Sequence, residues 1–206
     1  MLNNIIIVLL LTALFQVSGA LFSWLAIKKI DKHHNTVLLI EIIIMIIIAG
    51  EIIVFSAQQS KAAWIGFIAG IAAVAALNRF VPHKHASESQ RLGFLVFIAM
   101  CIHELPEGVA FGSTFIMDAK VGLLTAALIA LHNIPEGSIV AMPFLLKNKV
   151  RHAFTLTAIT QALYILGGLG AYFFLISVST AAQAVSASIA AGAMIYIAFE
   201  ELKFLR

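Results

Sequence analysis

Long apolar runs separated by short polar connections make up nearly all of this chain. A helix that crosses a bilayer needs about 20 predominantly apolar residues. Seven runs reach this length, and no alternation of apolar and polar positions competes with the helical interpretation. The runs cover residues 3–27, 36–57, 62–81, 91–115, 120–146, 153–176 and 182–203. The pattern predicts an all-α polytopic membrane protein, with seven transmembrane helices in a single transmembrane domain over residues 1–206.

The composition agrees with this interpretation. Of the 206 residues, 62% are hydrophobic and 11% are charged, and the mean hydropathy is +1.03. A soluble domain could not bury that much apolar surface, so we expect a lipid bilayer around the chain. A pI of about 9.1 would suggest nucleic acid for a soluble protein, but these basic residues lie in short loops, so no nucleic-acid partner is expected. The single cysteine, Cys101, excludes an internal disulfide and an all-cysteine metal site, and we expect it to pack rather than ligate.

The distribution of lysine and arginine predicts the orientation in the membrane. If the N-terminus lies outside, only Lys61 and Lys120 of the 13 basic residues fall on the outer side, which leaves eleven inside. Positive residues accumulate in cytoplasmic loops, so we expect a multi-pass protein of the cell (inner) membrane with a cytoplasmic C-terminus. The inner residues are Lys28, Lys29, Lys32, Arg79, Lys84, Arg91, Lys147, Lys149, Arg151, Lys203 and Arg206.

A weak internal repeat links the two ends of the chain. Residues 12–16 in the first run (Thr-Ala-Leu-Phe-Gln) match residues 157–161 in the sixth (Thr-Ala-Ile-Thr-Gln), and these runs would cross the membrane in opposite directions. Such inverted repeats are common in secondary transporters, although apolar helices also match by chance. The repeat would place helices 1–3 and 6–7 as an incomplete inverted repeat around a central pair, helices 4 and 5.

Two near-copies of one motif place polar residues inside that central pair. Residues 103–108 read His-Glu-Leu-Pro-Glu-Gly, and residues 132–137 read His-Asn-Ile-Pro-Glu-Gly. Because successive helical residues turn by about 100°, the histidine and last glutamate of each copy share one face, with the residue after the histidine at its edge. These positions are His103, Glu104, Glu107, His132, Asn133 and Glu136.

Two facing helices with this pattern would assemble imidazoles, carboxylates and an amide in a low dielectric. That ligand set suits Zn²⁺ and other divalent ions such as Cd²⁺, Fe²⁺ or Mn²⁺, and a bound cation relieves the cost of burying carboxylates. A lone buried His or Glu is often only a structural hydrogen-bonding residue, but two copies with Pro and Gly preserved favour a metal site.

The prolines and glycines of the motifs have predicted roles too. Pro106 and Pro135 cannot donate to the carbonyls of Ile102 and Leu131, so we expect a local kink and free carbonyls at the level of the ligands. Small residues allow helices to approach closely. The glycines expected to do so are Gly108, Gly112 and Gly137.

At these motifs the chain resembles the ZIP family of divalent-metal (zinc and iron) transporters, in its bacterial and archaeal form. The resemblance extends over essentially the whole chain and implies a transport path with a binuclear metal site, so two ions are expected. One half would use His103, Glu107, His132 and Glu136. The other would use Glu104, Asn133, a bridging Glu136 and Gln161 of the sixth run. Glu104 stands where many members have Asn, and Gln161 where they usually have Glu, so we expect a rearranged second position with altered metal preference.

The family's eighth helix has no counterpart after the seventh run. The resemblance therefore leaves three explanations: a naturally short chain, a gap covered by another subunit, or a truncated sequence. Family members form homodimers, which fits the second explanation.

Three functions from different classes remain to be compared. The leading hypothesis is a transporter, not an enzyme, that moves a divalent metal ion into the cytoplasm by alternating access. An intramembrane metalloprotease is the second, because His103-Glu104 with Glu107 is one residue away from the H-E-x-x-H pattern, although Asn133 could not act as a base. A metal-binding sensor or non-transporting relative is the third.

Several further polar residues have open roles. Glu51 could be a relay carboxylate or a polar helix contact, Glu200 could receive an exiting ion or be solvated at the interface, and Gln16 could be an amide ligand or join helices. Asp118 and Lys120 are expected in a solvated turn. The loop histidines, for which a role without metal is favoured, are His33, His34, His83, His85 and His152.

Overall fold

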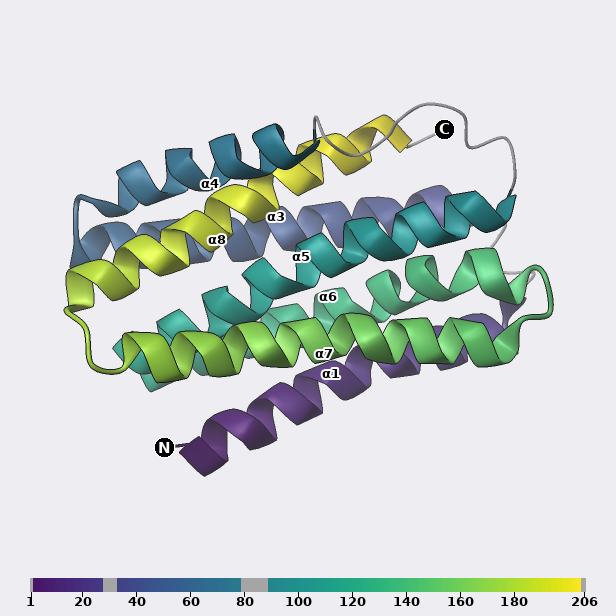
Figure 1. Cartoon of the computed structure of the whole chain (residues 1–206), viewed down its shortest axis with the longest axis horizontal. Helices are drawn as coiled ribbons and strands as arrows, with labels where there is room; N and C mark the ends of the chain where they lie inside the picture. The colour runs from purple at the N-terminus through teal and green to yellow at the C-terminus, as the bar shows by residue number, and fades with distance from the viewer. Residues whose placement is uncertain (1, 28–32, 79–88, 205–206) are drawn as a thin grey trace.

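The computed structural model describes residues 2–27, 33–78 and 89–204, and their side chains except those of residues 34, 78, 89–99 and 204. Long helices make up these residues (Figure 1). The helices are α1 (Leu2–Leu25), α3 (His34–Gln59), α4 (Ala63–Asn78), α5 (Ser89–Met117), α6 (Ala119–Leu145), α7 (Val150–Leu175) and α8 (Thr180–Glu201), followed by the short 3-10 helix η1 (Leu202–Phe204). The predicted all-α class is confirmed, and one helix corresponds to each predicted run.

Five of the helices have the length and apolar composition needed to cross a membrane: α1, residues 35–59 of α3, α6, α7 and α8. The described part of α4 has 16 residues, and α5 carries a histidine and two glutamates in its apolar half. The membrane character is therefore supported, while the exact number of spans stays a prediction. The basic loop residues from 28 to 32 and from 79 to 88, with His83 and His85, lie outside the described residues.

The helices form two groups that meet at α5 and α6 (Figure 1). In one group α1 lies along α6 and α5 lies along α7; in the other, α8 lies along α4 and α3. The groups join where α5 packs on α8 and where α6 packs on α3. The α5–α6 pair is thus central, as expected, whereas the inverted repeat stays a prediction.

Close packing at the glycines holds the central pair against its neighbours. A Cβ atom on Gly137 of α6 would collide with the backbone carbonyl of Gln16 on α1. A Cβ atom on Gly108 of α5 would lie 2.8 Å from the Gly168 nitrogen of α7, and one on Gly112 would lie 2.6 Å from the Gly168 carbonyl oxygen. The predicted close approach at these glycines is confirmed, and it fixes the depth at which the motif side chains meet.

The distribution of apolar and polar side chains is that of a membrane protein. Large apolar side chains point outward, with Phe174 78% and Ile65 72% exposed, while the polar motif residues are buried between helices. Lipid can cover the apolar exterior, but buried polar groups must find partners inside the protein. The partners of the motif residues therefore define the site.

Candidate metal centre

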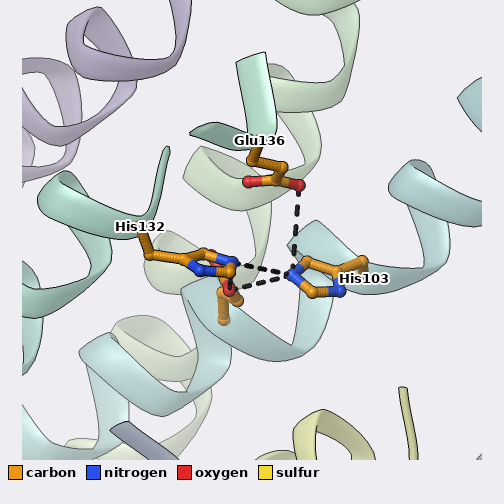
Figure 2. Close-up of side chains that lie close together, drawn as sticks. His103, His132 and Glu136 are labelled. Carbon is orange, nitrogen blue, oxygen red and sulfur yellow. Dashed lines mark hydrogen bonds and ion pairs between the residues drawn. The ribbon is translucent and has the colours of Figure 1, made fainter. Parts of the chain in front are cut away.

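Four motif side chains from α5 and α6 converge in the centre of the bundle. His103 and Glu107 lie one turn apart on α5, and His132 and Glu136 lie one turn apart on α6. One ligand atom from each residue lies within 4.8 Å of the other three, and all four side chains are buried. Figure 2 shows both imidazole rings and the Glu136 carboxylate pointing toward one another. The structure thus brings together the four residues that the motifs singled out, and their role as metal ligands stays a prediction.

The distances in this cluster are those of ligands around one small cation. His103 Nε2 lies 3.3 Å from His132 Nε2, and Glu107 Oε1 lies 3.0 Å from His103 Nε2 and 3.3 Å from His132 Nε2. Glu136 Oε1 is more distant, 3.9 Å from His103 Nε2. Four ligands arranged tetrahedrally at zinc bond lengths are about 3.3–3.4 Å apart. The two histidines and Glu107 match this spacing, and Glu136 needs only a small movement to complete it.

A backbone contact from α3 orients one of the histidines. His132 Nδ1 lies 3.2 Å from the backbone carbonyl oxygen of Glu41. Because a carbonyl only accepts hydrogen bonds, Nδ1 carries the proton and donates it, and Nε2 presents its lone pair to the cluster. A metal-binding histidine is usually fixed by such a contact on its other nitrogen. The two rings are nearly parallel, at 17° with centroids 5.5 Å apart, so both Nε2 atoms point into the same space.

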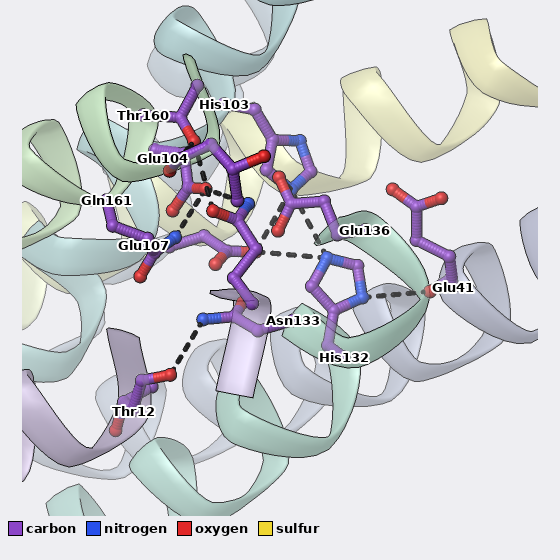
Figure 3. A network of polar contacts seen from close by, with 12 residues as sticks. Thr12, Glu41, His103, Glu104, Glu107, His132, Asn133, Glu136, Thr160 and Gln161 are labelled. Carbon is purple, nitrogen blue, oxygen red and sulfur yellow. Dashed lines mark hydrogen bonds and ion pairs between the residues drawn. The ribbon is translucent and has the colours of Figure 1, made fainter. Parts of the chain in front are cut away.

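Glu104 lies beside the cluster in a separate network of amides. Gln161 Nε2 on α7 donates to Glu104 Oε1 at 2.6 Å, and Gln16 Nε2 on α1 donates to the same oxygen. The hydroxyl of Thr160 donates to Gln16 Oε1 at 3.0 Å. Figure 3 shows Glu104, Gln161 and Thr160 gathered on one side of the histidines. Gln16, whose role was open, is therefore a hydrogen-bond donor to Glu104. Gln161, which occupies the matching position of the predicted repeat of residues 12–16 and 157–161, donates to the same oxygen.

The remaining predicted ligand, Asn133, contacts α1. Its amide nitrogen lies 3.3 Å from the Thr12 carbonyl oxygen, to which it donates. Four neighbouring groups still have buried oxygen atoms without a hydrogen-bond partner among the described residues. These atoms are Glu104 Oε2, Asn133 Oδ1, Gln161 Oε1 and both carboxylate oxygens of Glu136. Unpartnered buried oxygens are costly, and a cation is one way to satisfy them.

The two prolines lie inside continuous helices. Pro106 is within α5 and Pro135 within α6, so neither ends its helix. The predicted kink at this level stays a prediction.

The other polar residues divide between structural contacts and exposed positions. The Thr125 hydroxyl donates to Glu51 Oε2 at 3.1 Å, which is the helix contact foreseen as one of two roles. Glu200 pairs with Lys203 at 2.6 Å near the end of α8. Asp118 accepts from two backbone nitrogens at the start of α6 and is therefore a helix cap rather than only a solvated turn residue. His33 and His152 are exposed.

The fold and these contacts define a class: a polytopic helical membrane protein with a buried His/Glu centre able to hold a divalent metal ion. The family model described as ZIP zinc transporter matches residues 79–203, which is more than half of the chain. The chain therefore belongs to the ZIP zinc transporter family, whose members are transporters rather than enzymes. A search of curated proteins found no match.

Proposed function

We propose that this protein transports a divalent metal ion, with Zn²⁺ as the leading ion, across the cell membrane into the cytoplasm. The observation that carries the proposal is the buried cluster of His103, Glu107, His132 and Glu136, whose ligand atoms lie within 4.8 Å of one another. Two imidazoles and two carboxylates suit Zn²⁺, and Cd²⁺, Fe²⁺ or Mn²⁺ could compete for the same ligands. Family membership supports transport, because the family is one of zinc transporters.

The proposal includes a second ion next to the first. Both Glu136 oxygens lack a hydrogen-bond partner, so this carboxylate could bridge the two ions, with Glu104, Asn133 and Gln161 supplying further oxygens. The amides of Gln16 and Gln161 would then hold one Glu104 oxygen while the other binds the ion. An oxygen-only position would favour harder ions than the position with imidazoles.

Alternating access would arise from movement between the two helix groups. The metal ligands lie on α5 and α6, at the boundary where these helices meet α3 and α8. A sliding or rocking of one group against the other would expose the centre first to one side and then to the other. The positive-inside bias predicts only which side of the protein faces the cytoplasm, and the inward direction of transport is part of the proposal. A homodimer is proposed as the working unit, and cross-linking in the membrane would test it.

The proposal is tested by metal uptake into liposomes that contain the purified protein. Wild type should accumulate Zn²⁺, and His103→Ala, Glu107→Ala, His132→Ala and Glu136→Ala should each reduce uptake to the level of protein-free liposomes. His152→Ala is the matched control, because His152 is exposed at the start of α7 and should keep full uptake. Uptake unchanged in all four cluster variants would end the proposal. Tight binding without uptake would instead favour a sensor or non-transporting relative.

The metalloprotease alternative has less support. In an H-E-x-x-H enzyme the glutamate acts as general base on a metal-bound water. Here the corresponding residue, Glu104, accepts hydrogen bonds from Gln16 and Gln161 instead. Metal-dependent peptide cleavage by the purified chain would restore this alternative.

A further inference from the structure

Gln16 lies outside both motifs, and its amide reaches the proposed second-ion position from α1. Its side chain is 0% exposed, and its Nε2 donates to Glu104 Oε1. Gln161 Nε2 donates to the same oxygen from α7, so amides on two helices hold one oxygen of one carboxylate. The other oxygen, Glu104 Oε2, has no hydrogen-bond partner among the described residues. Glu104 therefore presents one oxygen, rather than both, to a bound ion.

The two amides differ in what their own oxygens do. Gln161 Oε1 is unpartnered in the described part of the chain, so this residue can also bind the ion. Gln16 Oε1 instead accepts a hydrogen bond from the Thr160 hydroxyl at 3.0 Å. A carboxylate oxygen only accepts hydrogen bonds, so the Gln16 amide must turn its N–H group toward Glu104 and its oxygen toward Thr160. Gln16 thus orients a proposed ligand without being one.

Tight packing of α1 on α6 fixes where the Gln16 side chain starts. A Cβ atom on Gly137 would collide with the Gln16 backbone carbonyl. One turn away, Asn133 Nδ2 donates to the Thr12 carbonyl oxygen at 3.3 Å and joins the same two helices. Because its backbone cannot shift, the Gln16 amide holds Glu104 in one orientation rather than following it.

That orientation limits how many oxygens the second ion can use. With one Glu136 oxygen given to the first ion, one oxygen remains from each of four residues: Glu104, Asn133, Glu136 and Gln161. Oxygen ligands alone do not reject Ca²⁺, because carboxylate and carbonyl oxygens suit it. Ligand number does, since Zn²⁺ takes about four ligands, whereas Ca²⁺ takes about six to eight oxygens and often both oxygens of a carboxylate.

We propose that Gln16 is a positioning residue that sets the choice of ion at the second position: with Gln161 it holds Glu104 to one available oxygen, which favours Zn²⁺ over Ca²⁺. This proposal rests on the second ion of the proposed function. Loss of the Gln16 amide leaves a single donor on Glu104, so the carboxylate can turn both oxygens toward the ion. The position then binds Zn²⁺ more weakly and Ca²⁺ more tightly.

The test measures ion binding by the purified full chain in detergent. Equilibrium dialysis with Zn²⁺ and, separately, with Ca²⁺ gives the number of bound ions and their affinities, and the visible absorption of Co²⁺ reports the centre with its imidazoles. Gln16→Met removes the amide but keeps a long unbranched side chain. Gln183→Met is the matched control, because Gln183 is a buried amide that donates to the backbone carbonyls of Leu175 and Val178 instead.

A second variant acts on the same contact from α7. Thr160→Val removes the hydroxyl that holds Gln16 Oε1 and keeps the size of the side chain. Thr157→Val is its matched control, since the Thr157 hydroxyl is equally buried on α7 but donates to the Ala153 carbonyl of its own helix. If Gln16→Met does not fold, Thr160→Val decides.

Gln16→Met should weaken binding of the second Zn²⁺ ion about tenfold or more, as changes to the partner of a metal ligand typically do, while the affinity for Ca²⁺ rises. Thr160→Val should shift both affinities in the same directions, by at least about threefold. Both controls should bind like wild type, and the Co²⁺ spectrum of the centre should stay the same in all four variants. An unchanged or lower Ca²⁺ affinity in both test variants overturns the inference, because a merely structural loss would weaken both ions together.

The same measurements separate this inference from the transport proposal. Wild type that binds only one Zn²⁺ ion would contradict the inference, whether or not the protein takes up metal. Wild type that binds two ions but shows no uptake into liposomes would contradict transport and leave the selectivity result readable.

Discussion

Replacing Glu107 by glutamine tests the centre most sharply among single changes. Glu107 Oε1 lies 3.0 Å from His103 Nε2 and 3.3 Å from His132 Nε2, so this oxygen adjoins both imidazoles. Glu107→Gln keeps the size of the side chain but removes its negative charge. The new amide can also direct its N–H group toward the space where the metal would bind.

The expected loss of zinc affinity follows from the contacts that Glu107 makes with both histidines. Changing only a partner of a metal ligand typically costs 10–100-fold in affinity, so loss of the ligand's charge should cost at least about 100-fold, or about 2.7 kcal/mol. Competition between the purified protein and a fluorescent zinc chelator measures this affinity. Glu51→Gln, a half-buried glutamate outside the cluster, should leave it unchanged. A change of less than about threefold in Glu107→Gln would refute the assignment of Glu107 as a ligand.

Three further predictions concern protons and packing. Zinc affinity and uptake should fall as the pH is lowered below neutrality, because protons compete with the metal for imidazole and carboxylate ligands; a rise in uptake would contradict this. Gly137→Leu should lower the melting temperature, at a cost of about 1–3 kcal/mol or more, because its side chain would collide with the Gln16 carbonyl. Gly50→Leu, with open space around it, is the control and should melt like wild type. Gln16→Leu should destabilise the protein by about 1.5–3 kcal/mol, since Glu104 loses a donor, whereas Gln59→Leu at an exposed position should not.

The convergence of the four central side chains could be predicted because their spacing repeats. His103 with Glu107 and His132 with Glu136 each lie four residues apart, and that spacing on a helix dictates a shared face. The prolines and glycines at the same offsets indicated that the two copies contribute to one site. The structure adds what spacing cannot supply, namely the separations between α5 and α6 and the carbonyl of Glu41 that orients His132.

The contacts that the sequence did not reveal come from residues outside the two His-x-x-Pro-Glu-Gly motifs. Glu41 is one of two acids in its apolar run, and Gln16 was marked only by the weak repeat with residues 157–161. Whether such a residue faces the site depends on the rotation of its helix, which packing against neighbours decides. At the end of α8 the sequence favoured Glu200 as a receiver of an exiting ion, yet Glu201 is the buried acid and Glu200 pairs with Lys203.

The existence of the helices was predictable because long apolar segments mark them in the sequence. Apolar length alone identifies α1, α3, α6, α7 and α8 as able to cross a membrane. Helix α6, which carries His132 and Glu136, is among these five, so the polar motif does not by itself conceal a membrane span.

X-ray absorption at the zinc edge of the zinc-loaded protein tests the central claim directly. The account predicts nitrogen and oxygen ligands at about 2.0–2.1 Å, together with the outer-shell scattering of imidazole rings. His132→Ala should reduce that imidazole scattering, and His152→Ala should leave it unchanged. A zinc spectrum without imidazole scattering, or one that His132→Ala does not alter, would contradict a centre built from His103, Glu107, His132 and Glu136.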